Sequence, residues 1–301
     1  MLPVAFTIFN YPVSSFGIFL IMGFLVGIFL IWRLSRAWDL DEEKILDLTL
    51  LTFLGGLFGA RIYFVLEHLS IFTPNLTKII LINKFPGFSF WGGFLGGWLT
   101  LFFLAKNKKE DFWQLADIAV IGFLGSLIFS DLGCFLGGCN VGVKTNLFFA
   151  VPVVGLIGRR FPVQILEALL FSGVLFNIWS QAIRFHARGK IVSLSLIYIG
   201  IIKFFIEPLK QNHDERKILS LVLFFLGITI YYKVMRKNLI LDIKRVGISF
   251  SKIITNPDFR KLVFDRFNKY WYNQTTLFFW NIKNFKKIIR RFNVRFSFKN
   301  H

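Results

Sequence analysis

The sequence predicts an all-α, polytopic membrane protein with about seven transmembrane helices. Hydrophobic residues make up 55% of the 301 residues, charged residues make up 18%, and the mean hydropathy is +0.60. This composition is typical of integral membrane proteins. A transmembrane helix needs about 20 mostly apolar residues. Seven runs meet that requirement, and they lie near residues 14–33, 45–66, 88–105, 113–130, 163–183, 191–209 and 218–235.

The first and the sixth of these runs differ from the others. The first run is longer than the apolar region of a cleavable signal peptide, and no Lys or Arg precedes Arg33. We therefore expect it to remain as the first helix. The sixth run contains Lys203 and Glu207, and ionisable residues inside a span usually mark function.

The distribution of positive charge predicts an N-terminus outside and a C-terminus inside the cell. The connections that would then face the cytoplasm carry Arg33, Arg36, Lys44, Lys106, Lys108, Lys109, Arg184, Arg188 and Lys190. Some segments predicted to lie outside do not follow this distribution of charge, because they also carry basic residues. These are Lys144, Arg159, Arg160, Lys210, Arg216 and Lys217. Positive residues there point to an anionic substrate in the outer leaflet.

The charge also suggests two domains, a membrane domain over residues 1–237 and a basic, aromatic tail over residues 238–301. From residue 236 onward there are sixteen Lys or Arg against three Asp, with Phe and Trp interleaved. A nucleic-acid tail is one interpretation. Because the segment directly follows a membrane span, we instead expect a cytoplasmic anchor on anionic lipid and no nucleic-acid partner.

Cys134 and Cys139 lie inside a predicted membrane segment. We expect two small side chains at a helix contact, with a disulfide as the alternative if the pair faces the oxidising side. Zinc needs about four ligands, and no histidine lies near the pair in sequence. We therefore predict no metal site and no cofactor.

Two glycine clusters, at residues 89–97 and 130–142, adjoin long apolar runs. Irregular backbone at membrane depth survives only where protein buries it or water lines it, so the clusters suggest a cavity where a substrate approaches the backbone. Gly55 and Gly59 form a different pattern, a small-xxx-small face for close helix packing. Packing does not explain Arg61, which needs a partner or a phosphate.

Polar residues also recur at helical spacing near two predicted span ends. Arg160, Gln164 and Glu167 are spaced four and three apart and would share one helix face. Lys203 and Glu207 would pair with each other, while Lys210 reaches the membrane interface. For both sets the alternative is a purely structural ion pair.

Five segments in this order resemble the bacterial prolipoprotein diacylglyceryl transferases, over roughly residues 10–235. They are residues 56–63 (GLFGARIY), 89–97 (SFWGGFLGG), 131–139 (DLGCFLGGC), 160–168 (RFPVQILEA) and 200–210 (GIIKFFIEPLK). The chain departs from the family pattern at five positions, two of which are Phe16, where the family usually has a tyrosine, and Gly137, which replaces an asparagine. Trp91 replaces a histidine, and Asp131 and Lys203 replace arginines.

The resemblance implies transfer of diacylglyceryl from phosphatidylglycerol to the lipobox cysteine thiol of prolipoproteins, in the bacterial cytoplasmic membrane. It implies that phosphatidylglycerol and the prolipoprotein signal peptides are the partners. Matching the family's motifs gives the catalytic candidates Lys203, Glu207, Asp131 and Trp91. It gives the substrate-binding candidates Arg61, Gly92, Gly93, Gly133, Gly138, Arg160, Gln164, Glu167 and Lys210.

The reaction needs an acceptor for the thiol proton, and we expect His68 or Asp131 to supply it. Cations near the departing phosphate would stabilise its negative charge. The departures at Trp91, Asp131 and Lys203 leave a second hypothesis, a catalytically silent family member that binds lipid or signal peptide. A transporter or scaffold is the third.

Overall fold

The computed structural model describes residues 4–8, 11–73, 76–79, 87–153, 155–211, 217–269, 271–273, 275–276 and 283. The chain divides into two units, Met1–Arg236 and Lys237–His301.

The first unit consists mainly of helices. Its long helices are α1 (Ser15–Ala37), α2 (Glu42–Glu67), α4 (Phe90–Asn107), α5 (Phe112–Gly137), α6 (Val163–Ala182), α7 (Lys190–Ile206) and α8 (Lys217–Met235). Short helical turns are α3 (Leu69–Phe72), η1 (Leu76–Ile79) and η2 (Glu207–Leu209). Two antiparallel strand pairs, β1 (Val4–Ile8) with β2 (Tyr11–Ser14) and β3 (Val151–Pro152) with β4 (Arg159–Arg160), complete the unit. These strands are not among the predicted elements, because their sequences (VAFTI, YPVS, VP and RR) show no strict alternation of apolar and polar residues.

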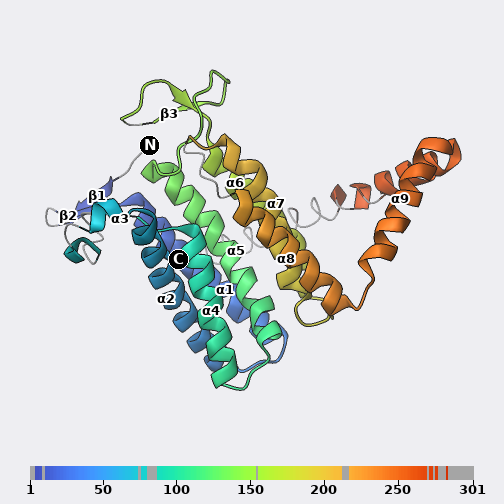
Figure 1. Cartoon of the computed structure of the whole chain (residues 1–301), viewed down its shortest axis with the longest axis horizontal. Coiled ribbons are helices and arrows are strands. Elements are labelled where there is room, and N and C mark those ends of the chain that lie inside the picture. The colour runs from blue at the N-terminus through green and yellow to red at the C-terminus, as the bar shows by residue number, and fades with distance from the viewer. Residues whose placement is uncertain are drawn as a thin grey trace, which may run out of the picture. The chain divides into compact units, whose positions relative to one another are not determined.

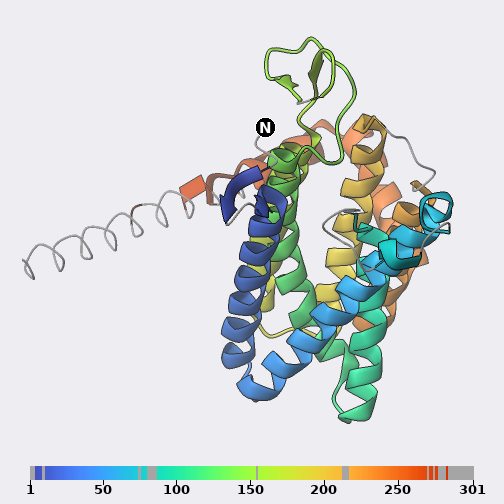
Figure 2. The same ribbon diagram turned by 90° about the vertical axis from the view of Figure 1, so that its left-hand side faces the viewer.

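Three helix pairs make up the bundle. α1 packs along α5, α2 along α4, and α7 along α8 (Figures 1 and 2). α5 also contacts α4, α6 and α7, so it is the central helix. Its buried side chains include Ile121 and Leu124, which are fully inaccessible. The helix that carries Asp131 is therefore fixed from several sides.

Polar residues before the apolar runs set where several helices begin. Asp41 caps α2 by accepting a hydrogen bond from Lys44 N at 3.2 Å, and Asp111 caps α5 by accepting from Trp113 N at 2.9 Å. A side-chain oxygen there satisfies an amide that the helix leaves free. α5 ends at Gly137, and its C-cap residue Gly138 has a φ of 77°, in the left-handed region that favours glycine.

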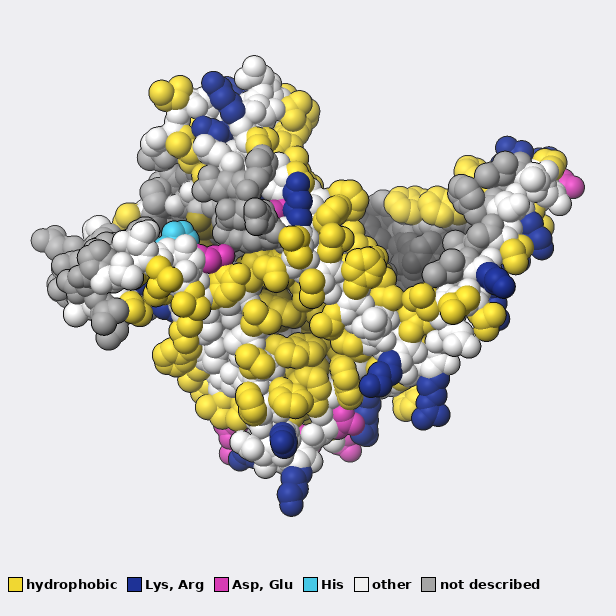
Figure 3. Space-filling model, viewed as in Figure 1, with side chains coloured by type: hydrophobic (Ala, Val, Ile, Leu, Met, Phe, Trp, Pro, Cys, Tyr) yellow, Lys and Arg dark blue, Asp and Glu magenta, His cyan; other side chains and the backbone are white. Residues whose placement is uncertain are grey.

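Large apolar side chains cover the outside of this unit, as expected for a protein in lipid. Figure 3 shows them as a broad band, with charged side chains gathered below it. Phe58 on α2, Phe103 on α4 and Phe205 on α7 are all well exposed. Among the described residues, six helices are long and apolar enough to cross a membrane. The chain is therefore a mostly helical, polytopic membrane protein.

The difference from the predicted number of seven lies in α4. This helix covers the run near residues 88–105, so a helix forms where a span was predicted. α4 contains four glycines and ends in the polar residues Lys106 and Asn107, and it is not among the six helices that meet the requirement of length and apolarity. Whether α4 crosses the membrane stays a prediction.

The basic connections predicted to face the cytoplasm meet at one end of the bundle. Lys44, at the start of α2, forms an ion pair with Glu110, just before α5. Arg188, just before α7, pairs with Asp111 at 2.8 Å. The predicted direction of insertion stays a prediction, but these contacts join the segments that it assigns to one side.

The second unit begins with α9 (Leu239–Thr255), and another helix follows over residues 257–269. Phe264, Phe267 and Trp271 are spaced three and four apart and are exposed. Phe267 stacks on Trp271, with ring centroids 6.4 Å apart. Exposed basic side chains accompany them, namely Arg260, Lys261, Arg266 and Lys269.

Candidate functional site

Five of the predicted site residues gather at one end of the first unit, and we call them the charge cluster. They are Asp131 on α5, Glu167 on α6, Lys203 on α7, Glu207 in η2 and Lys210 just after it. Asp131 lies within electrostatic range of Glu167 and of both lysines. Glu167, Lys203 and Glu207 are buried, which is costly for charged groups unless they are paired.

Lys203 pairs with Glu167 and not with Glu207. Its ammonium group donates a hydrogen bond to Glu167 Oε1 and lies 4.2 Å from the centre of the Phe90 ring. The predicted pairing of Lys203 with Glu207 is therefore wrong. α6 packs beside α7 and presents Glu167 to Lys203, so a partner from another helix replaces the one a turn away.

Lys210 completes the cluster from the end of η2. Its Nζ lies 2.9 Å from Glu207 Oε2 and 4.0 Å from Glu167 Oε2. Glu167 thus lies between the two lysines, with one carboxylate oxygen directed to each. The pairs hold both ammonium groups at fixed positions near the end of the bundle.

We call residues 139–161 the flap. Near its start, residues 142–144 are hydrogen-bonded or bridged to the backbone around Arg160 and around Lys210. Gly142 forms an antiparallel bridge with Lys210, and Lys144 forms one with Arg160. Val143 lies between them, donating to Leu209 O at 2.9 Å and accepting from Phe161 N at 3.1 Å. The base of the flap is therefore hydrogen-bonded on both sides.

Arg160 and Gln164 take different places from those predicted. Arg160 belongs to β4, and α6 begins only at Val163, so Arg160 does not share a helix face with Gln164 and Glu167. The predicted common face is wrong for this residue because the chain is extended before Pro162. Arg160 Nε is buried, and no described residue accepts a hydrogen bond from it.

Gln164 holds the start of the flap. Its amide group donates hydrogen bonds to Cys139 O at 2.6 Å and to Asn140 O at 3.1 Å. These bonds satisfy two carbonyl groups just after α5 ends. The structure thus gives Gln164 a supporting place, and its predicted contact with substrate stays a prediction.

Arg61 is buried and supports the connection that follows α2. Nε donates to Ile79 O and Nη1 donates to Gly87 O, both at 3.0 Å. The guanidinium carbon lies 5.3 Å from the centre of the Phe72 ring. The partner that Arg61 needed thus includes backbone carbonyl groups, and its predicted contact with a lipid phosphate stays a prediction.

The glycines of the first cluster face a neighbouring helix. A Cβ added to Gly92 would meet Gly59 O and Tyr63 Cβ, and one added to Gly93 would lie 3.4 Å from Ala60 Cβ. The small residues of α2 and α4 therefore pack backbone to backbone, as Gly55 and Gly59 predicted.

The other predicted glycines and Trp91 also have structural surroundings. A Cβ on Gly133 would lie 2.6 Å from Phe19 Cβ on α1, and Gly138 caps α5. Trp91 is 4% exposed and meets Phe90 edge to face, with ring centroids 5.1 Å apart. A direct contact of these residues with substrate stays a prediction.

Cys134 and Cys139 form a disulfide. The expected arrangement, two unlinked side chains at a helix contact, is therefore wrong, and the alternative holds. After α5 ends at Gly137, the chain turns back so that Cys139 N donates to Cys134 O at 3.1 Å. This reversal brings the two sulfur atoms together at the start of the flap.

His68 lies at the end of α2, where it is the C-cap residue. Its ring stacks on Phe64 with centroids 4.4 Å apart, and Nδ1 lies 3.0 Å from Phe64 O. These contacts are typical of a residue that closes a helix.

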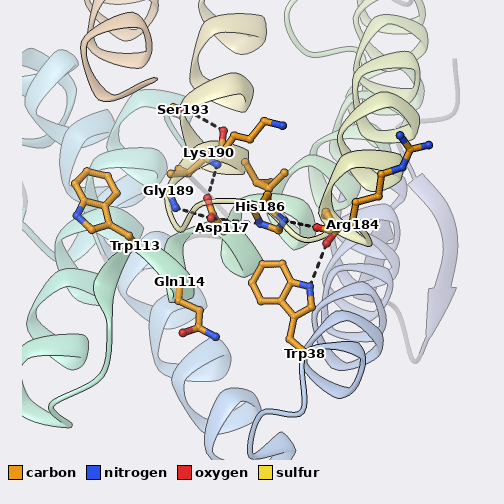
Figure 4. Close-up of polar contacts among 12 residues, drawn as sticks. Trp38, Trp113, Gln114, Asp117, Arg184, His186, Gly189, Lys190 and Ser193 are labelled. Carbon is orange, nitrogen blue, oxygen red and sulfur yellow. Dashed lines mark hydrogen bonds and ion pairs between the residues drawn. The ribbon is translucent and has the colours of Figure 1, made fainter. Parts of the chain in front are cut away.

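Sequence reasoning missed a second buried carboxylate, Asp117 on α5 (Figure 4). Asp117 is fully buried and accepts hydrogen bonds from Gly189 N at 2.6 Å and Val192 N at 2.7 Å. It thereby caps α7 from a neighbouring helix, since the cap residue Gly189 has no side chain to do so. The sequence did contain a signal for this buried carboxylate, because Asp117 is a lone Asp within the apolar run at 113–130.

His186 faces the same carboxylate, as Figure 4 shows. Its Nε2 lies 3.7 Å from Asp117 Oδ2, and its Nδ1 lies 2.7 Å from Arg184 O. Both ring nitrogens face acceptors, so the doubly protonated imidazolium fits this position. The contact with Asp117 raises the pKa of His186, although burial acts in the opposite direction.

Residues 3–233 match the family model described as prolipoprotein diacylglyceryl transferase. A phosphatidylglycerol–prolipoprotein diacylglyceryl transferase of Finegoldia magna is 27% identical over 208 residues, which cover 69% of this chain and 83% of that protein. One from Geobacter sulfurreducens is 29% identical over 210 residues, 68% of this chain and 80% of that protein.

A further relative is the transferase numbered 1 of Clostridium perfringens. It is 29% identical over 220 residues, covering 70% of this chain and 83% of that protein. The family model ends at residue 233, so the match lies within the first unit. With more than half of its residues matched, the chain belongs to the prolipoprotein diacylglyceryl transferase family.

Proposed function

We propose that this chain transfers the diacylglyceryl group of phosphatidylglycerol to the lipobox cysteine thiol of prolipoproteins. Membership of the family and the names of its relatives supply the reaction class. The observation that carries the proposal is the charge cluster, in which Glu167 holds the two ammonium groups of Lys203 and Lys210 at one end of the bundle. Such fixed cations suit a reaction that releases a phosphate.

In the proposed reaction the thiol sulfur attacks the glyceryl carbon, and the carbon–oxygen bond to the phosphate breaks. Negative charge then grows on the departing glycerol phosphate. Cations that are already positioned in a low-dielectric site stabilise such a transition state more than they would in water. We assign this role to Lys203, Lys210 and Arg160.

The other residues support these cations or shape their surroundings. Glu207 orients Lys210 directly, and Glu167 orients both lysines. Trp91 and Phe90 form an apolar wall, and the Phe90 ring lies against Lys203. The remaining candidates Arg61, Gln164, Gly92, Gly93, Gly133 and Gly138 would act by holding the backbone around the site.

The second candidate function is a silent family member that binds lipid or signal peptide. Two observations favour this silent function. Trp91 is buried where the family pattern has a histidine, and Lys203 already forms an ion pair with Glu167. The two functions differ in whether a covalent product forms. Both place the protein in the bacterial cytoplasmic membrane, with the charge cluster at the outer end.

The experiment follows labelled phosphatidylglycerol into a lipobox peptide, using the purified full chain. We expect Arg160→Ala to lower the rate by about 100-fold to 1,000-fold, the size typical of removing one fixed donor to a developing anion. Arg159→Ala is the matched control, because the neighbouring Arg159 is exposed. We expect it to leave the rate unchanged.

A labelled peptide with the intact chain, lost in the Arg160 variant, supports the transferase. If the intact chain binds the labelled lipid but forms no product, under conditions where a relative does, the silent function replaces it. Equal rates for the Arg159 and Arg160 variants would remove Arg160 from the site.

We further propose that the second unit lies on anionic lipid at the cytoplasmic face. Its exposed aromatic side chains Phe264, Phe267 and Trp271 are flanked by exposed lysines and arginines. Apolar contact combined with attraction to acidic headgroups is the usual basis for such binding.

A further inference from the structure

The charges of the cluster do not balance, and Asp131 is the residue in excess. Lys203 pairs with Glu167, and Lys210 pairs with Glu207. Two lysines are thus matched by two glutamates. Asp131 adds a third carboxylate, and no described residue forms an ion pair with it.

Asp131 also lacks the hydrogen bonds that a buried carboxylate normally has. Its Oδ2 atom is buried and accepts no hydrogen bond from the described residues. Buried polar atoms are nearly always satisfied, so an exception needs an explanation.

Asp117 provides a comparison within the same helix. Both of its oxygens accept short hydrogen bonds from backbone amides, and His186 faces it as a counter-ion. The fold thus supplies donors to the carboxylate at the predicted cytoplasmic end of α5. At the other end of α5, the fold supplies no hydrogen-bond donor from the described residues to Asp131 Oδ2.

We infer that Asp131 is the catalytic base that takes the proton of the acceptor cysteine thiol. This inference rests on the proposed transferase function and assigns a role that Lys203 and Lys210, as paired cations, cannot fill. His68, the other candidate, closes α2 and stacks on Phe64. The carboxylate of Asp131 lies within electrostatic range of Lys203 and Lys210, two of the cations to which we assign the phosphate.

The S–H proton moves to Asp131 Oδ2, the sulfur forms a bond to the glyceryl carbon, and the carbon–oxygen bond breaks. Its electron pair leaves on the glycerol phosphate. Asp131 becomes neutral, which removes the excess charge of the cluster, and then returns the proton to the departing phosphate oxygen. No oxidant, reductant or metal takes part.

The test compares two acceptor peptides, one with the lipobox cysteine and one with selenocysteine in its place. A selenol is largely ionised at neutral pH, so it needs no base, whereas a cysteine thiol with a pKa near 8.5 does. We expect Asp131→Asn to lower transfer to the cysteine peptide by about 100-fold to 10,000-fold, the usual contribution of a general base. Transfer to the selenocysteine peptide should stay within about tenfold of the unchanged protein.

Two further variants separate this role from a structural one. Glu207→Gln, the same change in a residue that orients Lys210, should lower transfer to both peptides by the same factor. Asp131→Glu should recover part of the transfer to cysteine, since it restores a carboxylate. Thermal unfolding in detergent checks that each variant is folded.

Equal losses with both peptides in Asp131→Asn, or an unchanged rate with cysteine, would overturn the assignment of the base. The proposed function has a separate outcome. If the intact chain transfers lipid to neither peptide, the transferase proposal fails, and the role of Asp131 fails with it.

Discussion

At the scale of single residues, the same side-chain types serve different purposes according to their neighbours. Asp117 and Asp131 lie on one helix, yet only Asp117 has amide donors for both oxygens. Arg61 holds backbone carbonyls, while Arg160 Nε is buried without an acceptor among the described residues. Satisfied groups support the fold, and we propose that the unsatisfied atoms of Asp131 and Arg160 face the substrate.

One prediction at this scale concerns Gly59. A Cβ added there would lie 2.5 Å from Gly92 O and 2.7 Å from Gly96 Cα, both backbone atoms that cannot turn away. We expect Gly59→Ala to lower the free energy of unfolding by about 1–3 kcal/mol, the usual cost of overpacking. Thermal unfolding of the two proteins in detergent measures this difference in stability.

The control for this prediction is Gly173→Ala on α6. An added Cβ there meets no heavy atom within 4 Å. Alanine favours helix over glycine by up to about 1 kcal/mol, so this variant should be as stable as the original chain or more stable. If both variants unfold at the same temperature, close packing of α2 on α4 does not limit stability.

At the scale of elements, contacts between helices decide how α7 is placed. Its beginning is capped by Asp117 of α5, and near its end Lys203 is paired with Glu167 of α6. Both contacts involve groups far from α7 in sequence. The position of Lys203 therefore depends on two neighbouring helices, more than on the sequence of α7.

The cap of α7 predicts a dependence of stability on pH. The pKa of His186 is raised in the folded protein, above an ordinary value of about 6.5. Its contribution to stability is therefore fully present below about pH 6.5 and is lost as the pH rises through the raised value. We expect the difference in melting temperature between the original chain and His186→Gln to be largest near pH 6 and to shrink by about pH 9.

Arg188→Gln is the control for this experiment. Arg188 and two backbone amides lower the pKa of Asp111, outweighing burial, which acts to raise it. That contribution is lost only as the pH falls through the lowered value, so between about pH 6 and 9 the Arg188 variant should show a constant difference. A constant difference for the His186 variant as well would contradict the role of an imidazolium at this position.

At the scale of the whole molecule, the chain combines a membrane unit that matches the family with a basic unit outside the matched region. The first unit carries the charge cluster at one end and the cap of α7 at the other. The second unit carries exposed aromatic and basic side chains.

The proposed lipid contact of the second unit can be tested in the intact protein. We expect a cysteine at Phe267 to react with a polar maleimide several-fold more slowly in phosphatidylglycerol nanodiscs than in phosphatidylcholine nanodiscs, because anionic lipid covers the aromatic side. A cysteine at Asp265, on the opposite side of the 257–269 helix, should react at the same rate in both. Equal rates for the Phe267 variant in the two lipids would rule out this contact.

The sequence predicted the helices better than the contacts between them. Apolar length located the long helices of the first unit, and Gly55 with Gly59 indicated a close contact of α2. Spacing along the chain could not identify the partner of Lys203. Glu207 lies one helical turn away and fits the spacing, but the actual partner Glu167 is on another helix. Arg160 was placed on a helix because its spacing to Gln164 fits one, but the chain is extended there. The cap of α7 needs Asp117 and Gly189 to meet, which no local pattern reveals.

The order of the helix pairs has a consequence for biogenesis. α7 and α8 are neighbours in sequence and pack on each other, whereas α1 packs mainly on α5, which is much later in the chain. During synthesis α1 must therefore wait in the bilayer, or beside an insertase, until the chain through Gly137 has been translated. We therefore expect the small residues Gly23 and Gly27, which contact Ser126 on α5 in the folded protein, to lack this partner during that interval.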